Sequence, residues 1–220
     1  VMTGIDCLKR HHCDFNILTV VTDELCRHFS AVYEFYRKEG FEYQQYIPCM
    51  APAGGEPYQF LSDENYGDFL VTLYDLWSQD LDHGRYVYIR YFENLLQILA
   101  GYQPEECGSS GICSQQFLVE SDGSVYPCDF YVDDSYYLGN LHQNSIDDLS
   151  RKLEETHFIA NSRLLSENCR HCSFLSYCRG GCKRYRNAEG KYLYCNAIKK
   201  FLRYALDGLK KRLIDAGITA

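Results

Sequence analysis

Apolar positions in the first hundred residues alternate between the spacings of strands and helices. Residues 15–21 form a continuous apolar run of strand length, which is typical of a strand buried on both faces. Thr22 and Asp23 then offer a helix N-cap, apolar residues recur at helical spacing, and Gly40 ends the pattern. Residues 41–48 predict a second strand. This order of elements predicts parallel α/β units.

The following residues extend the same pattern. A loop rich in Gly and Pro is expected over residues 51–57, and Ser62 begins another helix with apolar residues on one face. Too few strand–helix units are present to close an eight-stranded barrel. We therefore expect residues 1–100 to form the C-terminal half of a partial (β/α) barrel within a protein of the α/β class.

The pattern changes in the second half of the chain. Apolar and polar residues over 116–126 surround Asp122 and Gly123, which predicts a β-hairpin with its turn at this dipeptide. An amphipathic helix is expected over residues 195–216, where leucines recur at helical spacing. Residues 101–220 are therefore expected to form a second, cysteine-rich domain with a β-hairpin and a C-terminal helix.

Composition and charge narrow the classes of function. The chain has 12 cysteines and a net charge of −8, and the charge argues against nucleic acid or an anionic membrane as a partner. It contains no apolar run of about 18 residues and no recognisable export signal. We therefore expect a cytoplasmic protein. In a reducing compartment, clustered cysteines bind metal more often than they form disulfides.

Eight of the cysteines lie in the second half at spacings typical of metal ligands. They are Cys107, Cys113, Cys128, Cys169, Cys172, Cys178, Cys182 and Cys195. The short Cys-x2-Cys spacing lets two thiolates reach one metal centre from a tight turn, and eight thiolates make two four-ligand sites. Basic neighbours would offset the negative charge of the thiolates; the candidates are Arg170, Arg179, Lys183 and Arg184. Spacing alone favours iron–sulfur clusters and structural zinc equally.

This arrangement of cysteines and neighbours resembles the SPASM domain of radical S-adenosylmethionine enzymes, and most closely the anaerobic sulfatase-maturing enzymes. The matching motifs are residues 46–49, 122–131, 168–172 and 177–182. The resemblance covers essentially the whole chain. The family's Cys-x3-Cys-x2-Cys motif is absent from these 220 residues. The chain therefore resembles the C-terminal portion of the family, and we expect it to be inactive by itself.

The resemblance implies how the cysteines divide between two auxiliary [4Fe–4S] clusters. The first cluster would be held by Cys107, Cys113, Cys128 and Cys182, and the second by Cys169, Cys172, Cys178 and Cys195. The full-length enzyme would also bind S-adenosylmethionine and a third [4Fe–4S] cluster. Ile47 matches a family position near the adenine of that cofactor.

The resemblance also implies a reaction. A 5′-deoxyadenosyl radical removes a hydrogen atom from the β-carbon of a Cys or Ser in an unfolded sulfatase polypeptide. Loss of a proton and of a second electron then leads to formylglycine, and an external electron acceptor takes up the electrons. Asp129 matches the family's catalytic base, and we expect partial burial to make its carboxylate a better proton acceptor.

Two alternatives stay open on the sequence. One is another SPASM-containing radical enzyme that modifies peptides, for example by forming a thioether or a crosslink. The other is a non-catalytic regulatory module that binds zinc or an iron–sulfur cluster. Pro127, Cys128 and Asp129 favour the sulfatase-maturing group over other peptide modifiers.

Overall fold

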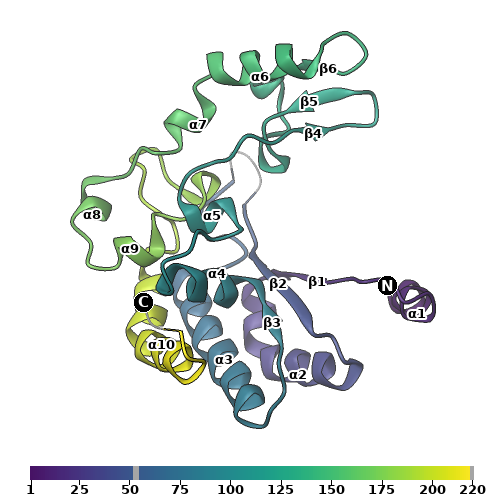
Figure 1. Cartoon of the computed structure of the whole chain (residues 1–220). Coiled ribbons are helices and arrows are strands. Elements are labelled where there is room, and N and C mark those ends of the chain that lie inside the picture. Colours follow the sequence, from purple (N-terminus) through teal and green to yellow (C-terminus); the bar gives the residue numbers. More distant parts are fainter. Residues whose placement is uncertain (52–54, 219–220) are drawn as a thin grey trace. The chain divides into compact units, whose positions relative to one another are not determined.

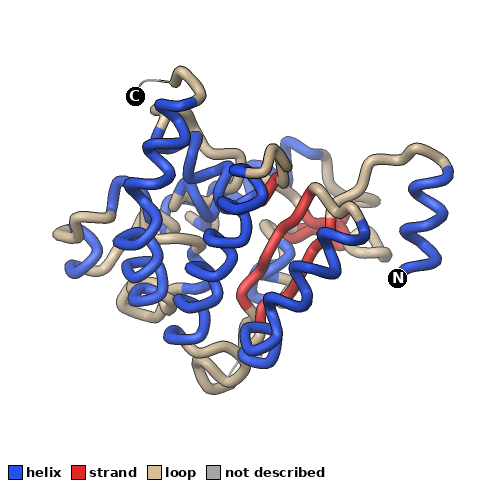
Figure 2. The backbone as a smooth tube through the Cα atoms, turned by 90° about the horizontal axis from the view of Figure 1, so that it is seen from below, coloured by secondary structure: helices blue, strands red, loops and turns tan. Residues whose placement is uncertain are grey.

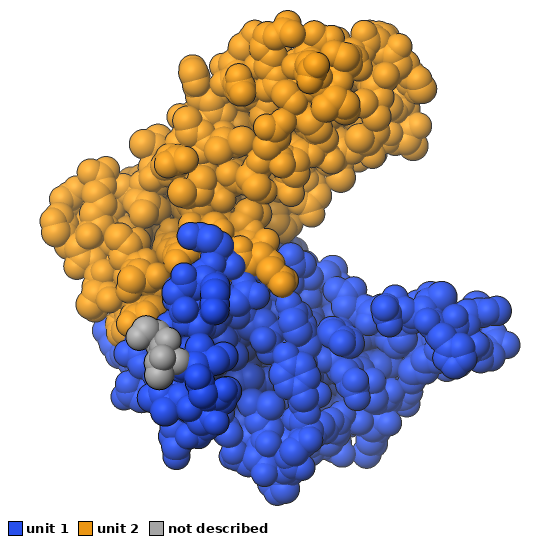
Figure 3. Space-filling model, viewed as in Figure 1, with its two compact units in different colours: residues 1–103, 193–220 blue, residues 104–192 orange. Residues whose placement is uncertain are grey.

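The computed structural model describes residues 1–51 and 55–218 (Figure 1). The chain divides into two compact units, which Figure 3 shows in different colours. Unit 1 comprises residues 1–103 and 193–220, and unit 2 comprises residues 104–192. The loop expected over 51–57 lies partly outside the described residues. Among the helices that the structure describes, none has the length and hydrophobicity that a membrane crossing requires.

Unit 1 combines a parallel sheet with helices, as expected for the α/β class. Its helices are α1 (Met2–Arg10), α2 (Asp23–Glu39), α3 (Asp63–Asp82), α4 (Arg90–Leu99) and α10 (Cys195–Asp215). Its strands are β1 (Ile17–Val21), β2 (Tyr43–Pro48) and β3 (Tyr88–Ile89). The strands lie in the order β1-β2-β3, all parallel (Figure 2, red).

The predicted boundaries of α2 are confirmed by its capping groups. The Thr22 hydroxyl accepts a hydrogen bond from the backbone N–H of Leu25 at 3.1 Å, which satisfies one of the free donors at the start of the helix. Gly40 ends the helix in the left-handed conformation, with φ of 69°. Helix α2 therefore begins and ends at the residues that the sequence pattern predicted.

Strand β1 differs from the prediction that it is buried on both faces. Leu18 and Val20 are 57% and 51% exposed, whereas Val21 is fully buried. Successive side chains of a strand point to opposite faces, and in the part of the chain described here only one face of this strand is covered. The continuous apolar run was therefore a correct signal for a strand but a wrong one for its burial.

Helix α10 belongs to the compact unit that contains the parallel sheet, although it follows the cysteine-rich segment in sequence. The Asp63 carboxylate accepts hydrogen bonds from the backbone N–H groups of Asn196 and Ala197, at 3.3 and 2.8 Å. On the same helix, the Phe201 ring stacks on Phe92 with 5.6 Å between ring centroids. These contacts tie the last helix to α3 and α4 of unit 1.

Unit 2 consists of short elements joined by loops. Its strands are β4 (Leu118–Val119), β5 (Ser124–Tyr126) and β6 (Gly139–Asn140). Its α-helices are α5 (Cys107–Ser110), α6 (Ile146–Glu155), α7 (Phe158–Asn161), α8 (Glu167–Arg170) and α9 (Leu175–Cys178). Its 3₁₀ turns are η1 (Asp129–Tyr131), η2 (Asp134–Tyr136) and η3 (Lys183–Tyr185).

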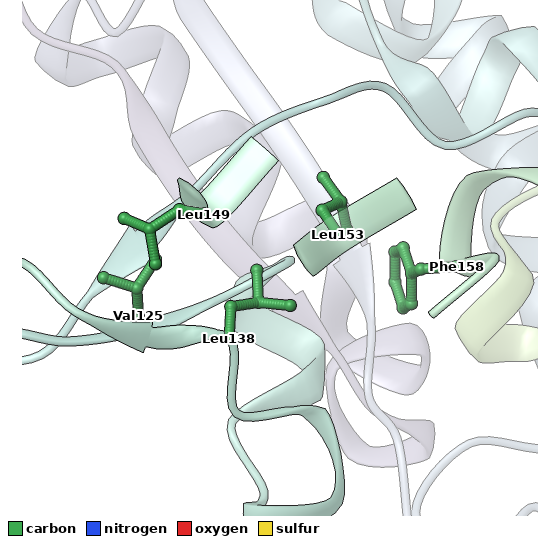
Figure 4. Close-up of a cluster of buried hydrophobic side chains, with 5 residues drawn as sticks. All are labelled: Val125, Leu138, Leu149, Leu153 and Phe158. Carbon is green, nitrogen blue, oxygen red and sulfur yellow. The ribbon is translucent and has the colours of Figure 1, made fainter. Parts of the chain in front are cut away.

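The predicted hairpin forms around Asp122 and Gly123. The Asp122 carboxylate accepts the backbone N–H of Ser124 at 2.9 Å, and Gly123 has φ of 84°, a conformation that favours glycine. Strand β6 adds to β5 as a third antiparallel strand. A cluster of buried side chains from β5, the residue before β6, α6 and α7 forms the core beside this sheet (Figure 4); its members are Val125, Leu138, Leu149, Leu153 and Phe158.

Candidate metal centre

The loop that carries Cys107 and Cys113 is held by close backbone contacts. Helix α5 begins at Cys107 and ends at Gly111, which has φ of 71°. A Cβ atom at Gly111 would lie 2.0 Å from the carbonyl oxygen of Arg179, so only glycine fits here. This approach brings the first cysteine loop against the segment between Cys178 and Cys182.

Cys113 is fixed by a buried serine. Its backbone N–H donates to the hydroxyl of Ser162 at 2.9 Å, and that hydroxyl donates to the carbonyl of Ile159 at 2.6 Å. Ser162 is fully buried. A buried hydroxyl with both a donor and an acceptor satisfied is a rigid support, so α7 sets the position of the Cys113 backbone.

Cys128 follows the hairpin directly. Its thiol donates a hydrogen bond to Asp129 Oδ1 at 3.1 Å, and the same oxygen accepts the backbone N–H of Phe130 at 3.1 Å. Burial raises the pKa of the Cys128 thiol to about 12, and the adjacent Asp129 carboxylate adds to this shift. The Asp129 side chain is exposed rather than partly buried as expected.

The sulfur of Cys182 has the other three cysteines of the predicted first set as neighbours. Burial, together with the charged forms of Cys107 and Cys113, raises the pKa of Cys182 to about 11. The charge of Cys182 in turn raises the pKa of Cys128. Four thiols from remote parts of the chain are thus gathered in unit 2. Their mutual repulsion as thiolates would be relieved by a cationic metal group, and thiolates are the ligands of iron–sulfur clusters.

The second predicted set is brought together only in part within unit 2. Cys169 is buried on α8, and the backbone N–H of Cys172 donates to the Cys169 carbonyl at 3.1 Å. Cys178 ends α9, just before three left-handed residues at 179–181. Cys195 opens α10 in unit 1. The completion of this set by Cys195 stays a prediction.

None of the 12 cysteines, all of which lie in the described part of the chain, forms a disulfide in the structure. Cys7 and Cys13, which lie outside the eight predicted ligands, are exposed, because α1 and the turn after it leave them at the surface. Within residues 1–51 and 55–218, no group of three or more His, Cys, Asp or Glu side chains is placed to hold a metal ion. The cysteine assignment therefore depends on the electrostatic proximity of the sulfurs and on the sequence.

Ile47 lies on β2, away from the cysteines in sequence. It is half-buried and pairs with Val20 of β1 in the parallel register. It therefore shares the partly open face of the sheet with Leu18 and Val20, because side chains at paired positions point to the same side. A role in cofactor binding for Ile47 stays a prediction.

Sequence reasoning missed Arg186. Its guanidinium donates five hydrogen bonds to backbone carbonyls of unit 2, and the charges of four cysteines act on it. Two of the basic residues that were expected to offset the cysteine charge are engaged elsewhere: Arg170 lies 3.6 Å from Glu167, and Arg179 donates to the Ser176 carbonyl. No spacing rule selects Arg186, since its acceptors at Ser162, Leu164 and Gly111 are remote in sequence.

Comparison with known proteins identifies the relatives of this chain. A model described as an iron–sulfur cluster-binding domain, SPASM, matches residues 107–173. A cysteine-type anaerobic sulfatase-maturating enzyme of Clostridium novyi is 39% identical over 91% of this chain and 56% of its own length. A serine-type enzyme of Klebsiella pneumoniae is 32% identical over 95% of this chain and 53% of its own length.

The fold of the chain is similar to that of a solved structure. Native anSMEcpe with bound AdoMet and the Kp18Cys peptide is 37% identical, with a TM-score of 0.92 over 97% of this chain and 61% of that one. The chain thus spans somewhat more than half the length of the relatives it matches. It belongs to the radical S-adenosylmethionine superfamily, carries a SPASM iron–sulfur cluster-binding domain, and is related along its length to the anaerobic sulfatase-maturing enzymes.

Proposed function

We propose that this chain supplies the auxiliary-cluster sites and the catalytic base of an enzyme that oxidises a Cys or Ser of an unfolded sulfatase polypeptide to formylglycine. The observation that carries the proposal is the gathering of Cys107, Cys113, Cys128 and Cys182 in unit 2, with the Asp129 carboxylate hydrogen-bonded to one of these sulfurs. The family relationship supports this function for the longer protein to which such a chain would contribute.

We take the eight cysteines as the ligands of two [4Fe–4S] clusters, divided as the sequence predicts. The four gathered thiols would provide one ligand set, and Cys169, Cys172 and Cys178 would provide three ligands of the other. When bound, such clusters would carry the substrate's second electron towards an external acceptor. The segment over residues 101–220 would act as the auxiliary-cluster domain.

Asp129 is proposed as the group that takes the proton from the substrate's thiol or hydroxyl. In the structure its Oδ1 accepts the thiol proton of Cys128 and the N–H of Phe130. Cys128 loses that proton when it becomes a metal ligand, and this leaves a lone pair on Asp129 free. Because the carboxylate is exposed, a bound peptide can reach it. A positioned carboxylate of this kind contributes about 10²–10⁴-fold to a proton-transfer step.

Residues 1–100 are proposed to form the second half of the family's partial barrel, which would bind S-adenosylmethionine. The three parallel strands of unit 1 support this arrangement. Ile47 would contact the adenine from β2, where its side chain lies on the partly open face of the sheet. A separate segment carrying the Cys-x3-Cys-x2-Cys motif would generate the radical.

Substitution of Asp129 tests the proposed base. In an enzyme that joins this chain to the motif-bearing segment, Asp129→Asn is expected to keep cleaving S-adenosylmethionine but to lower the formylglycine yield at least about hundredfold. Mass spectrometry of the peptide measures the yield. Asp133→Asn is the matched control, because Asp133 is an exposed carboxylate in the same loop. Its Oδ1 accepts a hydrogen bond from the Ser135 hydroxyl at 2.6 Å. Equal yields from the Asp129 variant and the unaltered enzyme would exclude this role.

Metal analysis tests the cluster sites independently of activity. After anaerobic reconstitution, the unaltered chain is expected to contain about eight irons with matching sulfide, as two [4Fe–4S] clusters require. Cys128→Ala should lower this content by up to half. A chain that binds about two zinc ions and no iron under these conditions would instead support the structural module.

A further inference from the structure

Arg186 makes an unusual set of hydrogen bonds for one side chain. All five bonds go to backbone carbonyls, and every acceptor lies in unit 2. The acceptors are the carbonyls of Gly180, Ser162, Leu164, Gly111 and Gly181, at 2.8, 2.6, 3.2, 2.9 and 2.6 Å. The guanidinium thus joins three segments: the loop before Cys113, the turn after α7, and the glycines between Cys178 and Cys182.

The charge of Arg186 has no carboxylate beside it. Within residues 1–51 and 55–218, no Asp or Glu forms an ion pair with this guanidinium. Burial lowers the pKa of Arg186 below its ordinary value, yet an arginine stays protonated in proteins. Five carbonyl dipoles solvate the cation, but they supply no net negative charge. A half-buried cation held in this way needs anions close by.

The groups that can supply those anions are cysteines of both predicted ligand sets. The charged forms of Cys182, Cys113, Cys169 and Cys178 all raise the pKa of Arg186, so their sulfurs lie near the guanidinium. The first two belong to one predicted cluster site and the last two to the other. Arg186 is therefore within electrostatic reach of unit 2 cysteines from both predicted sets.

From this arrangement we propose that Arg186 is a positioning residue shared by the two auxiliary iron–sulfur sites, which fixes their cysteine loops and supplies a permanent positive charge to both. The proposal rests on the proposed function, because it takes the eight cysteines as cluster ligands. A fixed cation beside a cluster stabilises the reduced, more negative state, so it raises the reduction potential. One side chain would then set both potentials together.

The geometry requires arginine rather than any cation. The guanidinium presents five N–H donors in a rigid plane, and the structure uses donors on all three of its nitrogens. A lysine would keep the charge but could donate at most three bonds from a single point. The two roles of Arg186, position and charge, can therefore be separated by substitution.

The test compares Arg186→Gln and Arg186→Lys in the full chain after anaerobic reconstitution. Iron and sulfide content reports the loop geometry, and redox titration followed by electron paramagnetic resonance reports the potentials. For R186Q we expect both midpoint potentials to fall by at least the equivalent of a tenfold change in the reduction equilibrium, about 59 mV for one electron. For R186K we expect potentials within that range of the unaltered chain but a lower iron content. Arg163→Gln, which removes an exposed arginine of the same unit, should change neither.

Each outcome bears on a separate statement. Unchanged potentials and full iron content in R186Q would overturn the role of Arg186 while leaving the proposed function intact, and a shift in one cluster alone would overturn the shared role. If R186Q retains no iron, the R186K variant decides the question. Midpoint potentials in R186K that lie about 59 mV or more below those of the unaltered chain would overturn the role of the charge. Failure of the unaltered chain to bind iron would overturn the proposed function and this inference together.

Discussion

The two units of the chain are held together in different ways. Unit 1 buries large aromatic side chains against one another, including Phe29, Trp77 and Phe201, each at most 1% exposed. Unit 2 has its hydrophobic cluster at residues 125–158, whereas its cysteine loops are fixed by backbone hydrogen bonds and by Arg186. Small domains with modest cores are commonly completed by metals. From this difference we expect the cysteine loops of unit 2 to depend on a bound metal for their stability, and unit 1 not to depend on one.

The largest difference in stability between the two units is expected when bound metal is removed. We expect a chelator under reducing, oxygen-free conditions to lower the amide-exchange protection of residues 169–186 by about ten-thousandfold, roughly 5.5 kcal/mol, because metal binding there is part of the folding free energy. Helix α3 of unit 1 serves as the internal control and should keep its protection. Equal loss of protection in both places would show that the units do not differ in this respect.

The next largest effect is expected from a substitution in the core of unit 1. Phe201→Ala removes a fully buried ring that stacks on Phe92, so we expect the free energy of unfolding to fall by about 3–5 kcal/mol. Urea unfolding followed by tryptophan fluorescence measures it, since Trp77 is buried in the same unit. Ile214→Ala on the same helix, at a position 66% exposed, should cost less than about 0.5 kcal/mol. A similar cost for the two variants would contradict the burial argument.

The smallest effect is expected at the start of α6. The Ser145 hydroxyl accepts the N–H of Asp148 at 3.2 Å, and the Asp148 carboxylate accepts the N–H of Ser145 at 3.2 Å, a capping box. Ser145→Ala should therefore lower the stability of unit 2 by about 1 kcal/mol without changing iron content. Ser145→Asp, which can also cap the helix, should lose little. A drop in bound iron with Ser145→Ala would mean that this end of unit 2 is coupled to the cysteine loops.

Local signals in the sequence identified much of the fold. The caps at Thr22 and Ser62 and the hairpin turn at Asp122 and Gly123 all depend on hydrogen bonds within a few residues. Each such bond follows from the residue type and its spacing. These elements were therefore predictable without any knowledge of tertiary contacts.

Other features were set by contacts that no local pattern encodes. Helix α4 was missed because the strand before it, β3, has only two residues and gives no alternation to read. The cysteine string identified the candidate site, but the exposure of Asp129 depends on how the hairpin packs. Arg186 reaches Gly111, which is 75 positions earlier in the chain. Its role could be seen only once the loops were folded together.

The position of Cys182 among Cys107 and Cys113 has a consequence for biosynthesis. A ribosome releases the early cysteines well before the last one, so no group that needs all of these sulfurs can be inserted during most of translation. The nascent segment must keep its thiols reduced and unliganded until the chain beyond Cys182 has emerged. If these sulfurs hold one metal centre, its assembly can begin only after Cys182 has emerged, and oxidants that act on the earlier thiols would prevent it.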